Sequence, residues 1–125
     1  MEERNHYMSR ATAVLCPTQY IEPFNCVAVE AQLCGTPVIS TDWGGFTETV
    51  EQGVSGFRCN YLGEFVDAIA ACKDLSPRVI RDRAVSKYSL EAVQVQYKRY
   101  FTRLQYVWEK GWYTTQNLRS DYAYR

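Results

Sequence analysis

Short blocks of hydrophobic positions predict three strands in this chain. Residues 11–16 (ATAVLC) form an apolar run that Pro17 ends, and residues 37–41 (PVIST) are rich in β-branched side chains. Runs of this length are typical of buried parallel strands rather than helices. A weaker third strand is predicted at residues 57–59, after the glycine-containing turn of residues 53–56.

Helical spacing predicts the elements between and after these strands. Asn25 is a suitable N-cap, and Gly35 followed by Pro37 indicates where the first of these helices stops. In the last helix, apolar residues recur three and four positions apart over five turns or so. The predicted helices cover residues 25–34, 46–51, 64–75, 78–86 and 89–111.

The alternation of strands and helices indicates the fold class. It predicts an α/β protein with a short parallel sheet of about three strands, flanked by helices and followed by a long C-terminal helix. This is about half of a doubly wound, Rossmann-like sheet. Residues 1–112 are predicted to form one domain, and residues 113–125, polar with scattered tyrosines and no period, a loose tail.

Composition and charge exclude several classes of function. Hydrophobic residues make up 46% of the 125 residues, and 14 basic side chains balance 14 acidic ones, which gives no surplus charge to attract nucleic acid. The five cysteines form no C-x-x-C pair, so neither a disulfide framework, a zinc site nor any other metal site is predicted. A polar start and the absence of a membrane-spanning run favour the cytoplasm.

The loop after the first predicted strand is the candidate ligand-binding site. In open α/β sheets, ligands lie beyond the carboxyl ends of strands, and a helix start offers free amides to an anion. The amides of Phe24, Asn25 and Cys26 could therefore hold a diphosphate. Glu22 and Glu30 could accept hydrogen bonds from hydroxyls on either side, because an ionised carboxylate is purely an acceptor. Taken alone, such a pair is more often an ordinary helix with acids near its positive end.

The longer string changes this interpretation. From Thr18 to Phe57 the chain reads T-x-x-x-EPFNCVAVEAQLCGTPVISTDWGGFTETVEQGVSGF. This closely resembles the donor-binding half of the family-four retaining glycosyltransferases, which have the GT-B fold. Glu22 and Glu30 match the family's E-x(7)-E motif, and a G-T-P-V strand and a D-x-G-G turn follow. The resemblance is strong over residues 11–57 and weaker in the later helices.

The resemblance implies a role for each matched residue. Glu22 corresponds to the catalytic glutamate that contacts hydroxyls of the transferred sugar, and Glu30 to the one that holds the ribose diol. Phe24, Asn25 and Cys26 match the loop whose backbone faces the sugar and diphosphate. Asn25 stands where the family commonly has glycine, and asparagine tolerates a left-handed backbone better than most residues.

Three further positions are possible members of the donor site. Thr18 begins the matched string, and Gly44 and Gly45 can permit close approach of the donor or of a partner domain, although a simple turn after a strand is about as probable. We expect both glutamates of the motif to face solvent in a cleft. No cofactor is implied, and the lack of a D-x-D signature agrees with the family's usual independence of metals.

The resemblance covers only part of an enzyme of this family. The family's acceptor domain and the first half of its donor domain have no counterpart here, so the chain is expected to be inactive alone. One hypothesis is a segment that binds a nucleotide-diphosphate sugar for retaining glycosyl transfer, with a second chain supplying the missing domain. The alternative is a non-catalytic module that binds a sugar nucleotide or a protein. Self-association through the unpaired edge at residues 11–16 is also expected.

Overall fold

The computed structural model describes residues 2–111. The chain divides into two compact units, Met1–Ser89 and Leu90–Arg125, and each is described by itself. The tail predicted at residues 113–125 lies outside the described residues.

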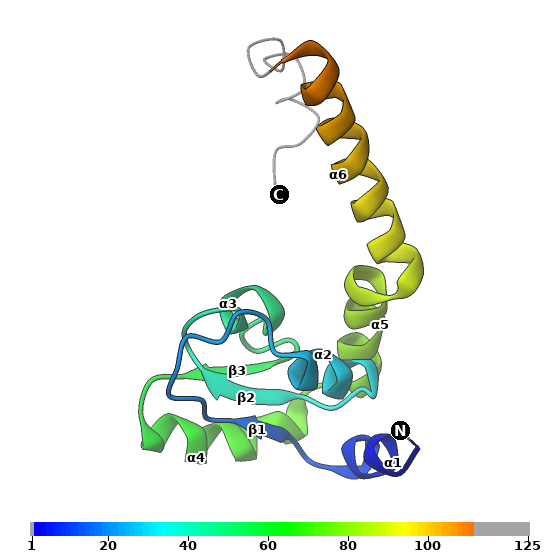
Figure 1. The fold of residues 1–125 in the computed structure, drawn as a ribbon. Coiled ribbons are helices and arrows are strands. Elements are labelled where there is room, and N and C mark those ends of the chain that lie inside the picture. Colours follow the sequence, from blue (N-terminus) through cyan, green and yellow to red (C-terminus); the bar gives the residue numbers. More distant parts are fainter. Residues whose placement is uncertain (1, 112–125) are drawn as a thin grey trace. The chain divides into compact units, whose positions relative to one another are not determined.

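A parallel sheet of three strands forms the centre of the first unit, in the order β1-β2-β3 (Figure 1). The strands are β1 (Val14–Cys16), β2 (Val38–Thr41) and β3 (Gly56–Cys59). All three predicted strands are confirmed, but the first begins three residues later than predicted. The reason is local: the Ala11 amide donates to the carbonyl of Tyr7 at 3.1 Å, so residue 11 still belongs to the end of a preceding helix.

Helices precede, connect and follow the strands, which confirms the α/β, partial Rossmann-like fold class with a long C-terminal helix (Figure 1). The first of them, α1, was not expected from the sequence. The helical segments are α1 (Glu2–Arg10), α2 (Cys26–Leu33), α3 (Phe46–Thr49), α4 (Leu62–Ala71) with the 3-10 turn η1 (Cys72–Asp74), α5 (Pro77–Tyr88) and α6 (Leu90–Lys110).

The core lies on both faces of the sheet. Side chains alternate along a strand, so Val38 and Ile39 of the central strand β2 point to opposite faces. All four residues of β2 are buried, as expected for a strand covered on both sides. One cluster contains Cys16, Ala28, Ala31, Val38, Phe46 and Val50. The other contains Ile39, Cys59, Ala68 and Cys72.

All five cysteines are free thiols. Burial is the main cause that raises the pKa of both Cys16 and Cys72 to about 11. These two thiols therefore stay protonated at neutral pH, and they pack in the core rather than act as nucleophiles.

A polar network around the buried Gln32 side chain fixes α5 to the rest of the first unit. The Arg83 guanidinium donates to the Glu51 carboxylate at 2.6 Å, and also to the side-chain oxygen of Gln32 and the carbonyl of Thr49. Gln32 is fully buried and donates in turn to the Thr49 carbonyl at 3.1 Å. The last residue of α3 and Glu51 just after it are thereby held against α2 and α5.

Candidate functional site

The candidate site is the loop that joins β1 to α2, and the turn after the neighbouring strand β2 holds it in place. The hydroxyls of Thr18 and Thr41 lie 3.2 Å apart. The Trp43 indole donates to the carbonyl of Tyr20 at 3.1 Å, and the Gly45 amide donates to the carbonyl of Glu22. Because the two strands are parallel, both loops leave the sheet at its carboxyl edge.

The two glycines of this turn contact the motif loop directly. A Cβ atom on Gly44 would lie 2.5 Å from the carbonyl oxygen of Glu22, and one on Gly45 would lie 2.6 Å from the carbonyl oxygen of Pro23. No side chain fits there without moving backbone. The close approach that these glycines permit is therefore to the chain's own loop, while contact of Gly44, Gly45 or Thr18 with a donor stays a prediction.

Glu22 is buried, with only 8% of its surface exposed, so the expectation that it faces solvent is wrong. Its Oε2 accepts from the Tyr20 hydroxyl at 2.6 Å and from the side-chain amide of Asn25 at 3.2 Å. Its Oε1 accepts from the Asn25 backbone amide at 3.2 Å. The bond from Tyr20 is the largest cause that holds the pKa of Glu22 below its usual value, despite burial.

Asn25 shapes the entry to α2. Its backbone is left-handed, with φ 63°, and its side-chain oxygen accepts from the Ala28 amide at 2.8 Å, which confirms it as the N-cap. Asparagine adopts this conformation more readily than most residues other than glycine. Unlike glycine, it also adds a side-chain bond to Glu22. The departure from the family's usual glycine is therefore compatible with the loop.

Phe24 and Cys26 flank this cap. Phe24 is partly exposed, and its ring meets the ring of Tyr88 edge to face with centroids 5.9 Å apart. Cys26 begins α2 and is exposed. Of the amides that the sequence assigned to a diphosphate, that of Asn25 donates to the Glu22 carboxylate instead. The anion at this helix start is thus supplied by the chain itself.

Glu30 lies four residues after Cys26, on the same side of α2. Its side chain is 33% exposed, and Oε1 accepts from the Arg4 guanidinium of α1 at 3.0 Å. Oε2 is buried and accepts no hydrogen bond within the described part of the chain. Only one of the two carboxyl oxygens of Glu30 is therefore engaged by the described part of the chain.

Sequence reasoning missed Tyr20 and Arg4, each of which donates to one of these carboxylates. Tyr20 lies two positions before Glu22, and this spacing is a signal that could have found it. Arg4 had no such signal, because it is 26 residues from Glu30 and α1 itself was not predicted.

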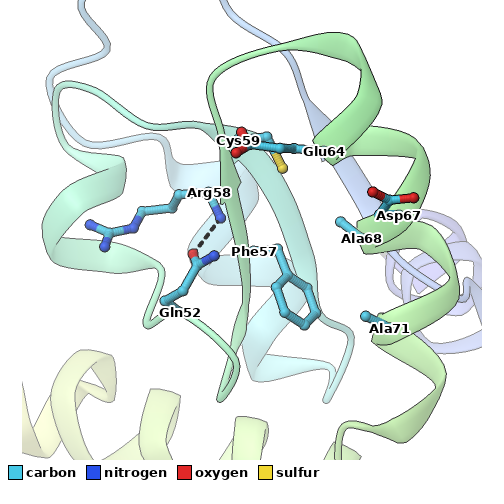
Figure 2. A pocket seen from close by; sticks show the side chains of 8 residues that line it. All are labelled: Gln52, Phe57, Arg58, Cys59, Glu64, Asp67, Ala68 and Ala71. Carbon is cyan, nitrogen blue, oxygen red and sulfur yellow. Dashed lines mark hydrogen bonds between the residues drawn. The ribbon is translucent and has the colours of Figure 1, made fainter.

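A cleft of about 210 Å³ lies elsewhere in the first unit, between β3 and α4 (Figure 2). Figure 2 shows Asp67 on α4 at one side and Gln52 at the other, with the Glu64 side chain reaching from α4 across to Cys59 at the end of β3. Gln52 accepts from the Arg58 amide at 2.7 Å. The Arg58 side chain points away from α4 and pairs with Asp42 at 3.4 Å. None of the predicted site residues lines this cleft.

Residues 2–111 contain neither a metal-binding cluster nor a membrane-spanning helix. No group of three His, Cys, Asp or Glu in this part could hold a metal ion. No helix in the same range is long and apolar enough to cross a membrane.

Comparisons with known proteins agree with this architecture. A D-inositol 3-phosphate glycosyltransferase of Kribbella flavida is 47% identical over 64 residues, which cover 50% of this chain and 15% of that protein. An alpha-maltose-1-phosphate synthase of Mycobacterium tuberculosis is 32% identical over 96 residues, which cover 66% of this chain and 24% of that protein. This chain therefore spans less than a quarter of the length of either relative.

A solved structure shows the same fold. The crystal structure of HepE from Anabaena in complex with UDP-glucose matches with a TM-score of 0.66 and 27% identity, over 78% of this chain and 29% of that one. Together with the parallel sheet and the motif loop at its carboxyl edge, this match defines part of a GT-B glycosyltransferase fold. The family model described as glycosyl transferases group 1 matches residues 1–79. The chain belongs to that family.

Proposed function

We propose that this chain carries part of the donor site of a retaining, family-four type glycosyltransferase and binds a nucleotide-diphosphate sugar. The observation that carries the proposal is the loop of residues 17–25, which the turn after β2 holds at the carboxyl edge of the sheet, with Glu22 at its end and Glu30 in the helix that follows. Membership of the glycosyl transferases group 1 family supports it, as does the UDP-glucose bound to HepE.

In this proposal each carboxylate recognises a different part of the donor. Glu22 accepts hydrogen bonds from hydroxyls of the transferred sugar, and Glu30 accepts from the ribose diol. Once Glu22, which accepts from the Asn25 amide in the free chain, turns to the sugar, the amides at the start of α2, at residues 24–26, face the diphosphate and stabilise the charge of the leaving group. Because Glu22 is already bonded in the structure, the sugar must replace the hydroxyl of Tyr20, whose side chain is largely exposed.

We propose that the acceptor does not bind to Glu22, Glu30 or the amides of residues 24–26. The names of the relatives refer to different reactions: glycosyl transfer that involves D-inositol 3-phosphate in one case, and synthesis of alpha-maltose 1-phosphate in the other. What the relatives share with this chain is a small part of their length. The proposed donor half-site therefore works together with polypeptide that the matched segment does not include. The location of this protein in the cytoplasm stays a prediction.

Calorimetric titration with UDP-, GDP- and ADP-glucose tests the donor site. We expect one of these sugars to bind, and Glu22→Gln and Glu30→Gln each to weaken binding by about tenfold or more, since a hydrogen bond to a charged group is lost. Glu3→Gln, on the exposed face of α1, is the control with the same change in charge. Unchanged affinity in both motif variants would rule out this site.

A non-catalytic binding module is the second candidate. It is favoured by the engagement of both glutamates with groups of the same chain, Glu22 with Tyr20 and Asn25, and Glu30 with Arg4. An assay of donor hydrolysis and of transfer to a range of acceptors separates the two functions. Binding without turnover, even when the missing domain is supplied in trans, would favour the module.

A further inference from the structure

We infer that Arg4 is a positioning residue of the nucleotide site: its ion pair with Glu30 orients that carboxylate for the ribose diol of a bound nucleotide. The inference rests on the proposed donor site, and it adds α1, which lies ahead of the matched motifs, to the parts of the chain that build the site.

The helix that carries Arg4 is fixed to the body of the first unit. Met8 is buried, and its carbonyl accepts from the Thr36 hydroxyl at 2.6 Å. Arg4 lies four residues before Met8, so the two side chains share one face of α1. That face meets α2, the helix of Glu30. The backbone that carries the Arg4 guanidinium is therefore fixed next to Glu30 by the contacts of α1 with the rest of the first unit.

The state of Glu30 indicates what Arg4 does there. Its Oε1 accepts from Arg4 at 3.0 Å, whereas its Oε2 is buried without a donor in the described part of the chain. A charged oxygen that is removed from water and left without a donor is unfavourable, so Glu30 needs a neighbouring cation to keep this orientation. Arg4 supplies that cation and one directed hydrogen bond.

The pair still leaves capacity for a ligand. An ionised carboxylate offers about four lone-pair sites, and Arg4 uses one of them. Two vicinal hydroxyls could take others after a small rotation of the carboxylate, which would also give Oε2 the donor that it lacks. A guanidinium that holds a ligand-binding carboxylate reduces the ordering that binding has to impose on it.

Removal of Arg4 should leave the fold intact, which makes the inference testable. The side chains of Arg4 and Glu30 are 47% and 33% exposed, and ion pairs at such positions contribute little to stability. An effect on nucleotide recognition can therefore be separated from an effect on folding.

The experiment compares UDP, ADP and GDP with their 2′,3′-dideoxy counterparts by calorimetry, in the wild-type chain and in Arg4→Gln, Arg4→Lys and Arg10→Gln. Arg10 is exposed on the same helix and contacts His6, so its variant is matched in charge and position. We expect the wild type to prefer the nucleotide with the diol by about tenfold or more. Arg4→Gln should reduce this preference to about threefold or less, while Arg4→Lys and Arg10→Gln should retain most of it.

Four results would count against the inference, and each has a different meaning. An equal preference in Arg4→Gln and Arg10→Gln would show that Arg4 does not position Glu30. An equal loss of affinity for both forms of the nucleotide in Arg4→Gln would place Arg4 at the phosphates or in the fold. Binding of the wild type without preference would remove the ribose role of Glu30 as well, and failure of the wild type to bind any nucleotide would contradict the proposed function itself.

Discussion

The carboxylate of Glu22 sits where an anionic ligand is expected, at the start of α2. It accepts from the backbone amide and the side chain of Asn25 and from the hydroxyl of Tyr20. A negative group at a helix start is stabilised by the free amides and the helix dipole. Glu22 therefore has two roles that compete: it organises the loop in the free chain, and in the proposed function it must turn to a sugar hydroxyl.

The first prediction concerns Tyr20 and pH. The hydrogen bond from Tyr20 is the largest cause that holds the pKa of Glu22 below the ordinary 4.5. A carboxyl group with a lowered pKa stabilises the fold above its unfolded pKa, and this contribution disappears as pH falls through its folded pKa. We expect Tyr20→Phe to lower the free energy of unfolding at neutral pH and to make its decline below about pH 4.5 shallower. Urea unfolding across this range measures both.

Tyr61→Phe is the matched control, because Tyr61 is 65% exposed and Tyr20 60% exposed. Its pH dependence should equal that of the wild type. If the free energy of unfolding of Tyr20→Phe depended on pH in the same way as that of Tyr61→Phe, the bond between Tyr20 and Glu22 would contribute nothing to stability in solution.

The second prediction concerns Gly45, whose φ of −62° is ordinary, so that only space requires glycine. A Cβ atom would lie 2.6 Å from the Pro23 oxygen and 2.8 Å from the Phe24 Cα, and this backbone would have to move. We expect Gly45→Ala to lower the free energy of unfolding by about 1–3 kcal/mol and to weaken sugar-nucleotide binding. Gly63→Ala, whose Cβ meets only the Tyr61 ring, should bind normally. Equal urea midpoints and affinities in the two variants would contradict the clash.

At the scale of single residues, the sequence was sufficient to predict contacts between residues that are close together in the chain. Asn25 could be predicted as an N-cap because its oxygen bonds an amide three residues ahead. The burial of Glu22 could not, since it depends on the path of the loop and on the turn of residues 42–45, which belongs to another strand. The contact between Arg4 and Glu30 could not be predicted either, because the two residues are 26 positions apart.

At the scale of elements, periodicity predicted the three strands and every helix from α2 onward. It did not predict α1, whose sequence EERNHYMSR is polar, with Met8 as its one buried hydrophobic residue. A helix of this composition depends on tertiary contacts, here the Thr36 bond to Met8 and the ion pair of Arg4. Amphipathic pattern alone cannot indicate such a helix, because it has almost no apolar stripe.

The third prediction tests the network that joins α5 to α2. Arg83, whose side chain is 11% exposed, bonds the Glu51 carboxylate, the Gln32 side chain and the Thr49 carbonyl. We expect Arg83→Met to lower the free energy of unfolding by about 2 kcal/mol, because the buried Gln32 oxygen loses its donor. Arg78→Met, at a side chain that is 90% exposed, should change it by less than about 0.5 kcal/mol. Urea unfolding at neutral pH measures both, and equal midpoints would contradict the assignment.

At the scale of the whole molecule, the family resemblance and the structure divide the chain in similar places. The family model matches residues 1–79, within the first compact unit, whereas α6 belongs to the second unit and lies beyond the match. Trp108 of α6 is 90% exposed. The sequence places two more aromatic residues just after it, at positions 112 and 113, outside the described residues. Exposed aromatic side chains often mark a contact surface, so we expect this end of the chain to have a docking role.

The open edge of the sheet is the other feature at this scale. β1 pairs only with β2 among the described strands, so one side of β1 has no strand partner. Leu15 is 54% exposed there, and a groove of about 420 Å³ runs between β1 and α4. The exposed apolar side chains that line it include Leu15, Leu62, Val66 and Ile69. Parallel sheets are normally covered on both faces, and an unpaired apolar edge favours association with another chain.

The last prediction is that a second copy of this chain covers this edge and groove. We expect light scattering at micromolar concentration to give a dimer or a larger assembly, since pairing would satisfy the free backbone groups of β1 and bury the apolar groove. Val66→Glu puts a charge into the groove and should shift the chain to a monomer. Val79→Glu, at an exposed site on α5, should leave the assembly unchanged. A wild-type monomer with rapidly exchanging amides in β1 would mean that the edge is simply open, and an assembly that survives Val66→Glu would have to form through another surface.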